Sequence, residues 1–174
     1  MSTYYVNTPL QGINFSQTFT LSTSTPEYPG LPIIPGTHVQ GSDGSTWVYV
    51  VLEAATTCTA NDWLIVTNNA TWEVKPITST LAKGKLGQRM GVAGGTGTAG
   101  QYLWMQTAGY NNSTNTATST AAFTALHSTA TAGRLSSTAV GGTSAAISGA
   151  VINATAAANV GIAIIGGVVV GADD

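Results

Sequence analysis

Charged residues are what this sequence has least of. Of its 174 residues, five are Lys or Arg and seven are Asp or Glu, so 7% are charged and the net charge is −2. An ordinary soluble domain has about 25% charged residues. Because no part of the chain carries a dense positive charge, binding along the phosphate backbone of a nucleic acid is not expected. A folded chain of this composition has a neutral surface that tends to associate, which favours a component of an assembly.

Signatures of disulfide, catalytic and metal sites are also missing. The single cysteine, Cys58, cannot form an internal disulfide. His38 lies near the turn Ser42-Asp43, but neither a nucleophile elbow nor a pair of carboxylates accompanies it. No two His, Cys, Asp or Glu residues stand at a spacing typical of metal ligands. The sequence therefore predicts no enzyme, no metal site and no cofactor.

A glycine-rich segment imitates a nucleotide-binding motif. Gly95–Gly100 fits the dinucleotide fingerprint G-x-G-x-x-G, but the residues that follow, Gln101–Thr107, have the pattern of a strand and not of a helix. A helix N-terminus is what would bind the pyrophosphate group. We therefore interpret the glycines as the loop of a β-hairpin.

The chain does contain a succession of short β-patterns separated by turns, and helical periodicity is absent from any long window. Three segments rich in β-branched and aromatic residues come first and favour an antiparallel meander: Thr46–Leu52, Asp62–Thr67 and Thr71–Ile77. Arg89–Ala93 and Gln101–Thr107 then flank the glycine loop. The predicted fold is all-β, an antiparallel β-sandwich or barrel that is jelly-roll-like, with an extended N-terminal arm.

Small and polar residues dominate after Arg89. We expect a polar loop at Asn111–Thr120, and a short helix near Ala154–Asn159 stays open. The further strand candidates are Phe123–Thr129, Ala139-Val140, Ala150–Asn153 and Gly161–Val170. The uncharged run Val160–Ala172 is shorter than the roughly 20 residues of a membrane span. It therefore predicts a buried strand, and no membrane partner is expected.

The first 35 residues differ from the rest, because five of the six prolines lie there. Proline removes a backbone donor and favours extended geometry in the residue before it. Apolar residues recur between the prolines at the spacing of a strand with one apolar face: Ile13, Phe15, Phe19 and Leu21. We predict an arm at residues 1–35 and a single β-rich domain at 36–174. The four apolar residues either anchor the arm to a neighbouring subunit or form an edge strand of the same domain.

The four tryptophans each lie in a predicted strand, and at least two are expected in the core. Aromatic residues exposed at turns would instead indicate stacking on sugars, as in a binding module. The best candidates for such a glycan contact are Trp72 and Tyr110.

Three blocks of the sequence resemble small virion proteins of tailed bacteriophages. The first is Gly36–Val50, which reads GTHVQGSDGSTWVYV. The second is Leu86–Ala93, followed by the glycine loop and Gly100–Gly109. The third is Leu126–Leu135, followed by a terminal strand rich in Ala, Val and Gly. The likeness runs from about residue 36 to residue 170 and leaves the arm unmatched.

This resemblance implies a head decoration, or cement, protein, which is a β-rich unit without catalytic residues. Such a protein binds the outer surface of the expanded capsid and stabilises it. The implied partners are the major capsid protein and further copies of the chain. The copies are expected to form a trimer, and a dimer is the other compatible oligomer. The implied location is the capsid exterior, after assembly in the host cytoplasm. The alternative is a receptor- or glycan-binding β-module of a phage head fibre or tail fibre.

Overall fold

The computed structural model describes residues 13–20, 33–117, 121–139, 143–152 and 160–172. Within these residues the protein consists of strands and one short helix, α1 (Ser79–Lys83). The strands are β1 (Thr18–Phe19), β2 (His38–Gln40), β3 (Thr46–Leu52), β4 (Trp63–Asn68), β5 (Glu73–Pro76), β6 (Met90–Ala93), β7 (Tyr102–Thr114), β8 (Leu126–Ser128), β9 (Leu135–Ser136), β10 (Ala145–Ile152) and β11 (Val160–Ala172). The prediction of an all-β fold is therefore confirmed.

Five of the strands close into a small barrel. β3 pairs with β5, β5 with β4, β4 with β6, β6 with β7, and β7 returns to β3. Closure leaves these strands without a free edge within the ring. Alternate side chains of the barrel strands point inward and, with Cys58 of the loop after β3, form one buried apolar cluster: Val48, Val50, Leu52, Leu64, Val66, Val74, Ala93, Leu103 and Met105.

The pairing of the first three long strands differs from the predicted antiparallel meander. β3 and β5 run parallel, with Val51 opposite Glu73 and Leu52 opposite Val74, and β4 pairs with β5 instead of β3. The connection from β3 to β4 is a long loop whose residue Cys58 forms a bridge with Gly97. Only a tight turn forces two consecutive strands to pair as neighbours, and this loop crosses to the glycine loop instead.

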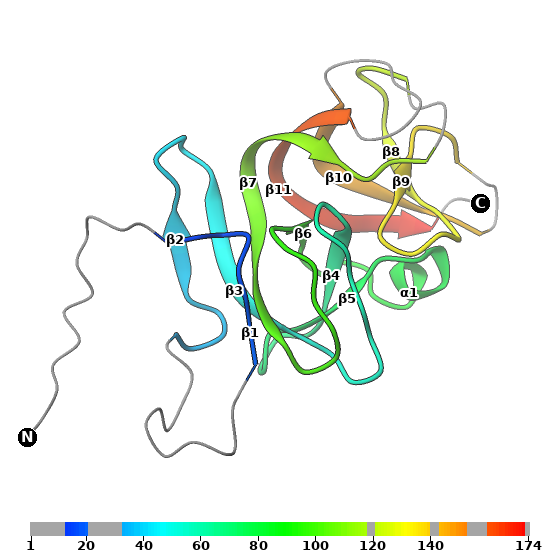
Figure 1. Ribbon diagram of the computed structural model, residues 1–174. Coiled ribbons are helices and arrows are strands. Elements are labelled where there is room, and N and C mark those ends of the chain that lie inside the picture. Colours follow the sequence, from blue (N-terminus) through cyan, green and yellow to red (C-terminus); the bar gives the residue numbers. More distant parts are fainter. Residues whose placement is uncertain (1–12, 21–32, 118–120, 140–142, 153–159, 173–174) are drawn as a thin grey trace, which may run out of the picture.

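A second layer of strands covers one side of the barrel. β7 continues past the barrel and bends towards β11, and the order then runs β11, β10, β8, β9 (Figure 1). Between this layer and the outer face of β4 and β6 lies the larger apolar core: Trp63, Ile65, Ile77, Ala82, Met90, Val92, Leu126, Leu135, Ala145, Ile147, Ala150, Ile152 and Val169. The molecule therefore has one core inside the barrel and another beside it.

Some element boundaries differ from the sequence predictions. The first part of the predicted loop Asn111–Thr120 is strand, since β7 extends to Thr114 and pairs with β11. Backbone pairing explains this, because it does not depend on the polarity of the side chains. β8 is shorter than the predicted strand Phe123–Thr129, and β10 begins before the predicted Ala150. Ala139 is not in a strand, whereas Val140 and the possible helix at Ala154–Asn159 lie outside the described residues.

Two further predictions are confirmed. The glycine loop joins β6 to β7 as an antiparallel hairpin, and Gly100 has a φ of +75° that favours glycine. Trp63 and Trp104 are fully buried, so two of the four tryptophans are core residues. The short helix α1 was not predicted; Thr78 caps it by accepting a hydrogen bond from the Leu81 N–H at 3.2 Å.

Residues 13–20, the described part of the N-terminal segment, run along the barrel. β1 pairs with the start of β7, on the edge that β6 occupies further along. The strand covers only Thr18 and Phe19, because residues 14–17 form a turn in which the Asn14 side chain accepts from the Ser16 N–H at 3.0 Å. The predicted strand was therefore too long at its start. Leu21 lies outside the described residues.

Candidate functional site

Two of the predicted arm anchors pack on an aromatic cluster of their own chain. Phe15 stacks on Trp47, with ring centroids 4.4 Å apart and planes 7° from parallel, and meets Trp104 edge-on at 5.6 Å. Phe19 lies edge-on to Tyr49 at 6.1 Å. These partners belong to the outer face of β3 and β7, because the residues between them point into the barrel. In this structure the segment is thus an edge strand of the same domain.

The glycine loop allows this close packing. A side chain at Gly94 would collide with the carbonyl oxygen of Phe15, and one at Gly95 with that of Ser16. The backbone of the segment therefore lies directly on the backbone of the loop. Ile13, the third predicted anchor, is 42% exposed. The described part of the segment thus leaves one large apolar side chain open to solvent.

Trp72 is held by contacts within the chain. Its backbone φ is +56°, and its indole ring fills the space that a side chain at Gly36 would need. His38 meets the ring edge-on at 5.6 Å, and the Arg89 guanidinium lies 5.6 Å from the ring centroid. The ring is half-buried against the core of the barrel. These contacts leave Trp72 little surface on which a sugar can stack.

Tyr110 lies at a different place, beside a cleft of about 390 Å³, and its side chain is 53% exposed. The structure therefore does not bring the two predicted glycan contacts together, since Trp72 borders a separate hollow with Arg89. The polar and aromatic residues that line the cleft are Ser16, Asp43, Trp47, Asn61, Gln106, Tyr110, Asn111 and Asn112. Sequence reasoning identified Tyr110 and missed the rest. The only signal for them was a polar residue, Gln106, within a strand of buried apolar residues.

The side chain of Gln106 shapes this part of β7. It is 2% exposed, and its amide nitrogen donates to the carbonyls of Ala108 at 3.3 Å and Tyr110 at 3.1 Å. Its carbonyl oxygen accepts from the Asn111 amide at 2.8 Å. These bonds support the bend around Gly109, whose φ is +99°. A buried, hydrogen-bonded amide therefore holds the backbone at Tyr110.

The turn between β2 and β3 forms another wall of the cleft. Oδ1 of Asp43 accepts from the Ser45 N–H at 3.0 Å and from the Ser45 hydroxyl at 2.5 Å. The same hydroxyl accepts from the indole nitrogen of Trp47 at 2.7 Å. The hydrogen bonds from Ser45 hold the pKa of Asp43 below its ordinary value. The cleft is thus bordered by an ionised carboxylate on a rigid turn.

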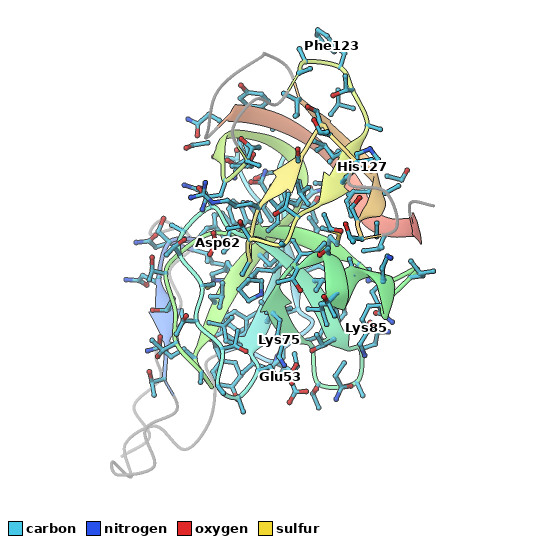
Figure 2. The ribbon with its side chains drawn as sticks, turned by 90° about the vertical axis from the view of Figure 1, so that its right-hand side faces the viewer. Glu53, Asp62, Lys75, Lys85, Phe123 and His127 are labelled. Carbon is cyan, nitrogen blue, oxygen red and sulfur yellow. The ribbon has the colours of Figure 1, made fainter. Side chains whose placement is uncertain are left out.

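One group of charged side chains, Glu53, Lys75 and Lys85, lies in the lower part of the view in Figure 2. Lys75 Nζ lies 2.8 Å from Glu53 Oε1, and the Thr67 hydroxyl donates to Glu53 Oε2 at 2.9 Å. Lys85 donates to the carbonyl of Thr67 at 3.0 Å. The bond from Lys75 is the main cause that holds the pKa of Glu53 below its ordinary value. Glu53 is therefore an ionised partner in an ion pair, and not a carboxyl group tuned to donate a proton.

Asp62 is a buried carboxylate whose hydrogen bonds connect parts of its own chain. Its oxygens accept from the Thr59 N–H and from the Asn115 amide, each at 2.7 Å. It joins the loop before β4 to the chain beyond β7.

Burial raises the pKa of the Cys58 thiol to about 11, which disfavours the thiolate needed for nucleophilic chemistry. Among the described residues, no three His, Cys, Asp or Glu side chains group to hold a metal ion.

In the part of the chain that the structure describes, no helix has the length and apolar character needed to cross a membrane. No protein-family model, curated protein or solved structure matches this chain.

Proposed function

We propose that this chain is a structural protein of a tailed-phage virion, without catalysis, that binds the outer surface of the expanded capsid and stabilises it. The three sequence blocks described above supply the protein class. Its partners are the major capsid protein and further copies of the chain, with which it forms a homotrimer in preference to a dimer. Many weak contacts repeated over a symmetric shell add up to a large effect through avidity.

The distribution of charge is the observation that carries this proposal. Between Met90 and Ala172, Arg134 is the only residue with a formal charge. This part of the chain contributes β6 to β11 and includes the whole second layer. Glu53, Lys75 and Lys85 belong to the other half of the sequence. Removing a neutral surface from water costs far less than removing a charged one, so the second layer suits burial against another protein.

Phe123 is the best candidate for an anchor in this half. It is 78% exposed, and Figure 2 shows it at the outer tip of the molecule. Its φ of +56° is unusual for a bulky residue, and strained backbone of this kind clusters at functional positions. Its N–H donates to the carbonyl of Ile152 at 3.1 Å, next to Val151, which is 38% exposed. An aromatic side chain in this setting is typical of an interface hot spot.

Co-sedimentation with expanded capsids that lack the protein tests the proposal. The purified chain is mixed with these capsids over a range of concentrations, and unexpanded shells serve as the control. We expect saturable pelleting at a fixed number of copies per shell subunit and a higher temperature of capsid opening. Absence of pelleting by a folded protein would remove the capsid function and leave the fibre module as the alternative.

A pair of variants tests the surface. Phe123→Lys places a charge on the neutral half, whereas Leu86→Lys places one on a side chain that is 51% exposed beside Lys85. Desolvating a new charge at an interface costs several kcal/mol, so we expect Phe123→Lys to weaken capsid binding at least about tenfold. Leu86→Lys should bind like the unmodified chain. Equal loss in both variants would contradict the assignment of the second layer to the capsid.

A further inference from the structure

The cleft beside Tyr110 is built from parts of the chain that are distant in sequence. Ser16 comes from the N-terminal segment, Asp43 from the turn between β2 and β3, and Asn61 from the loop before β4. Tyr110 and Asn112 come from β7. The volume of about 390 Å³ lies at the lower end of the range for small-molecule sites. It matches a ligand of one or two sugar rings.

Several polar groups in the cleft have hydrogen-bonding capacity to spare. Both bonds that Ser45 makes to Asp43 go to Oδ1, which leaves Oδ2 as an acceptor. The side chains of Asn61 and Asn112 line the cleft, and no side-chain hydrogen bond within the described residues uses them. Each primary amide offers two donors and one acceptor oxygen. One carboxylate oxygen and two amides therefore line the same cleft as the half-exposed Tyr110.

We propose that this cleft binds a neutral saccharide. The Tyr110 ring stacks on the apolar face of a sugar, and Asp43, Asn61 and Asn112 bind its hydroxyl groups. Neighbouring hydroxyls present the closely spaced donors and acceptors that planar carboxylate and amide groups match. Among the described residues that line the cleft, Asp43 is the only charged one, and its carboxylate disfavours phosphates, uronic acids and sialic acids.

Of the two glycan contacts predicted from the sequence, Tyr110 lines this cleft and Trp72 does not. Tyr110 is retained, but the carboxylate and amides of the cleft replace Trp72, whose ring is occupied by Arg89 and Gly36. The proposal does not depend on capsid binding, because the cleft is present in the free chain. On a capsid or on a fibre, such a site would let the particle hold on to surface glycans.

The purified chain, without capsids, is titrated with a panel of sugars. The panel contains glucose, galactose, mannose, N-acetylglucosamine and disaccharides of each, with glucuronic acid and N-acetylneuraminic acid as acidic comparisons. Binding is measured by saturation-transfer NMR and by the change in tryptophan fluorescence. We expect saturable binding of at least one neutral sugar and none of the acidic ones. No saturable binding across the neutral panel, or a preference for an acidic sugar, would overturn the proposal.

Variants then test whether the sugar binds in this cleft. Tyr110→Ala should weaken it about tenfold through the loss of stacking, whereas Tyr110→Phe should retain it. Asn112→Ala, at an exposed position, tests the hydrogen bonds without touching the fold. Ile34→Ala, which removes an exposed apolar side chain outside the cleft, is the control and should bind normally. Unchanged binding in both Tyr110→Ala and Asn112→Ala, or an equal loss in Ile34→Ala, would show that the sugar binds elsewhere.

Discussion

Substitution of Phe15 by alanine tests whether the N-terminal segment belongs to its own domain. The Phe15 ring stacks on Trp47 and touches Trp104 edge-on, and it covers the outer face of β3 and β7. Replacing a fully buried Phe by Ala costs about 3–5 kcal/mol. Phe15 is only half-buried, so we expect the free energy of unfolding to fall by about 2 kcal/mol. This total includes about 1 kcal/mol for the stacked pair.

The assay is urea unfolding followed by tryptophan fluorescence, which reports directly on the two indoles beneath Phe15. For a chain of this length, a loss of about 2 kcal/mol lowers the melting temperature by about 4–8 °C. Ile13→Ala is the matched control, since Ile13 lies in the same segment and is 42% exposed. It should change the free energy of unfolding by no more than about 0.5 kcal/mol.

Two results would refute this reasoning. If Phe15→Ala is as harmless as Ile13→Ala, the ring does not pack on its own barrel in solution. If the loss of stability shrinks with dilution of the protein, the segment packs on a neighbouring copy, because only an intermolecular contact depends on concentration. The second result would favour the interpretation of residues 1–35 as an arm that binds a neighbouring subunit.

Three other measurements test the fold. Because the pKa of the Cys58 thiol is about 11, about one molecule in a thousand carries the thiolate at pH 8. We therefore expect no reaction with a thiol reagent until urea unfolds the chain. Rapid labelling of the native protein would be the contrary result. The Glu53–Lys75 pair should contribute about 0.5 kcal/mol. Folding lowers the pKa of Glu53 from 4.5, so this stability is present above pH 4.5 and is lost as the pH falls through the folded pKa. In urea unfolding, the difference in stability between the unmodified protein and Lys75→Met should therefore vanish in acid. A difference that stays constant with pH would argue against the pair. Gly133 and Gly44 have positive φ values of +74° and +81°, but of these two only Gly133 has a side chain where its Cβ would lie. Gly133→Ala should therefore lower the melting temperature clearly more than Gly44→Ala. Equal shifts would contradict the packing at Gly133.

Local sequence patterns predicted much of the first half of the barrel. β-branched and aromatic residues marked β3 and β4 to within a residue or two, and the glycines marked the hairpin between β6 and β7. These signals are local, because strand propensity and turn geometry depend on residues close together in the chain. The parallel pairing of β3 with β5 had no such signal. It follows from closure of the ring, in which strands distant along the chain become neighbours.

The candidate site was less predictable than the fold. Tyr110 could be identified as an aromatic residue near a polar stretch, but its exposure depends on the bend that Gln106 supports. Trp72 looked equivalent in sequence, yet Arg89 and Gly36 enclose its ring. Asp43 and Asn61 come from different loops and line one cleft with residues of β7 only in the folded chain. No pattern within a single segment encodes such a convergence.

Composition and residue pattern are sufficient to predict the class of the molecule. Twelve charged residues in 174, with β-patterns and frequent turns, dictate an all-β chain with a neutral surface, because composition and alternation act residue by residue. Tertiary structure decided which surfaces those residues form. It folded Phe15 and Phe19 onto the barrel, left Phe123 exposed, and gathered Asp43, Asn61 and Tyr110 around one cleft. Exposure and proximity are properties of the whole packed chain, and residues far apart in sequence acquire them only together.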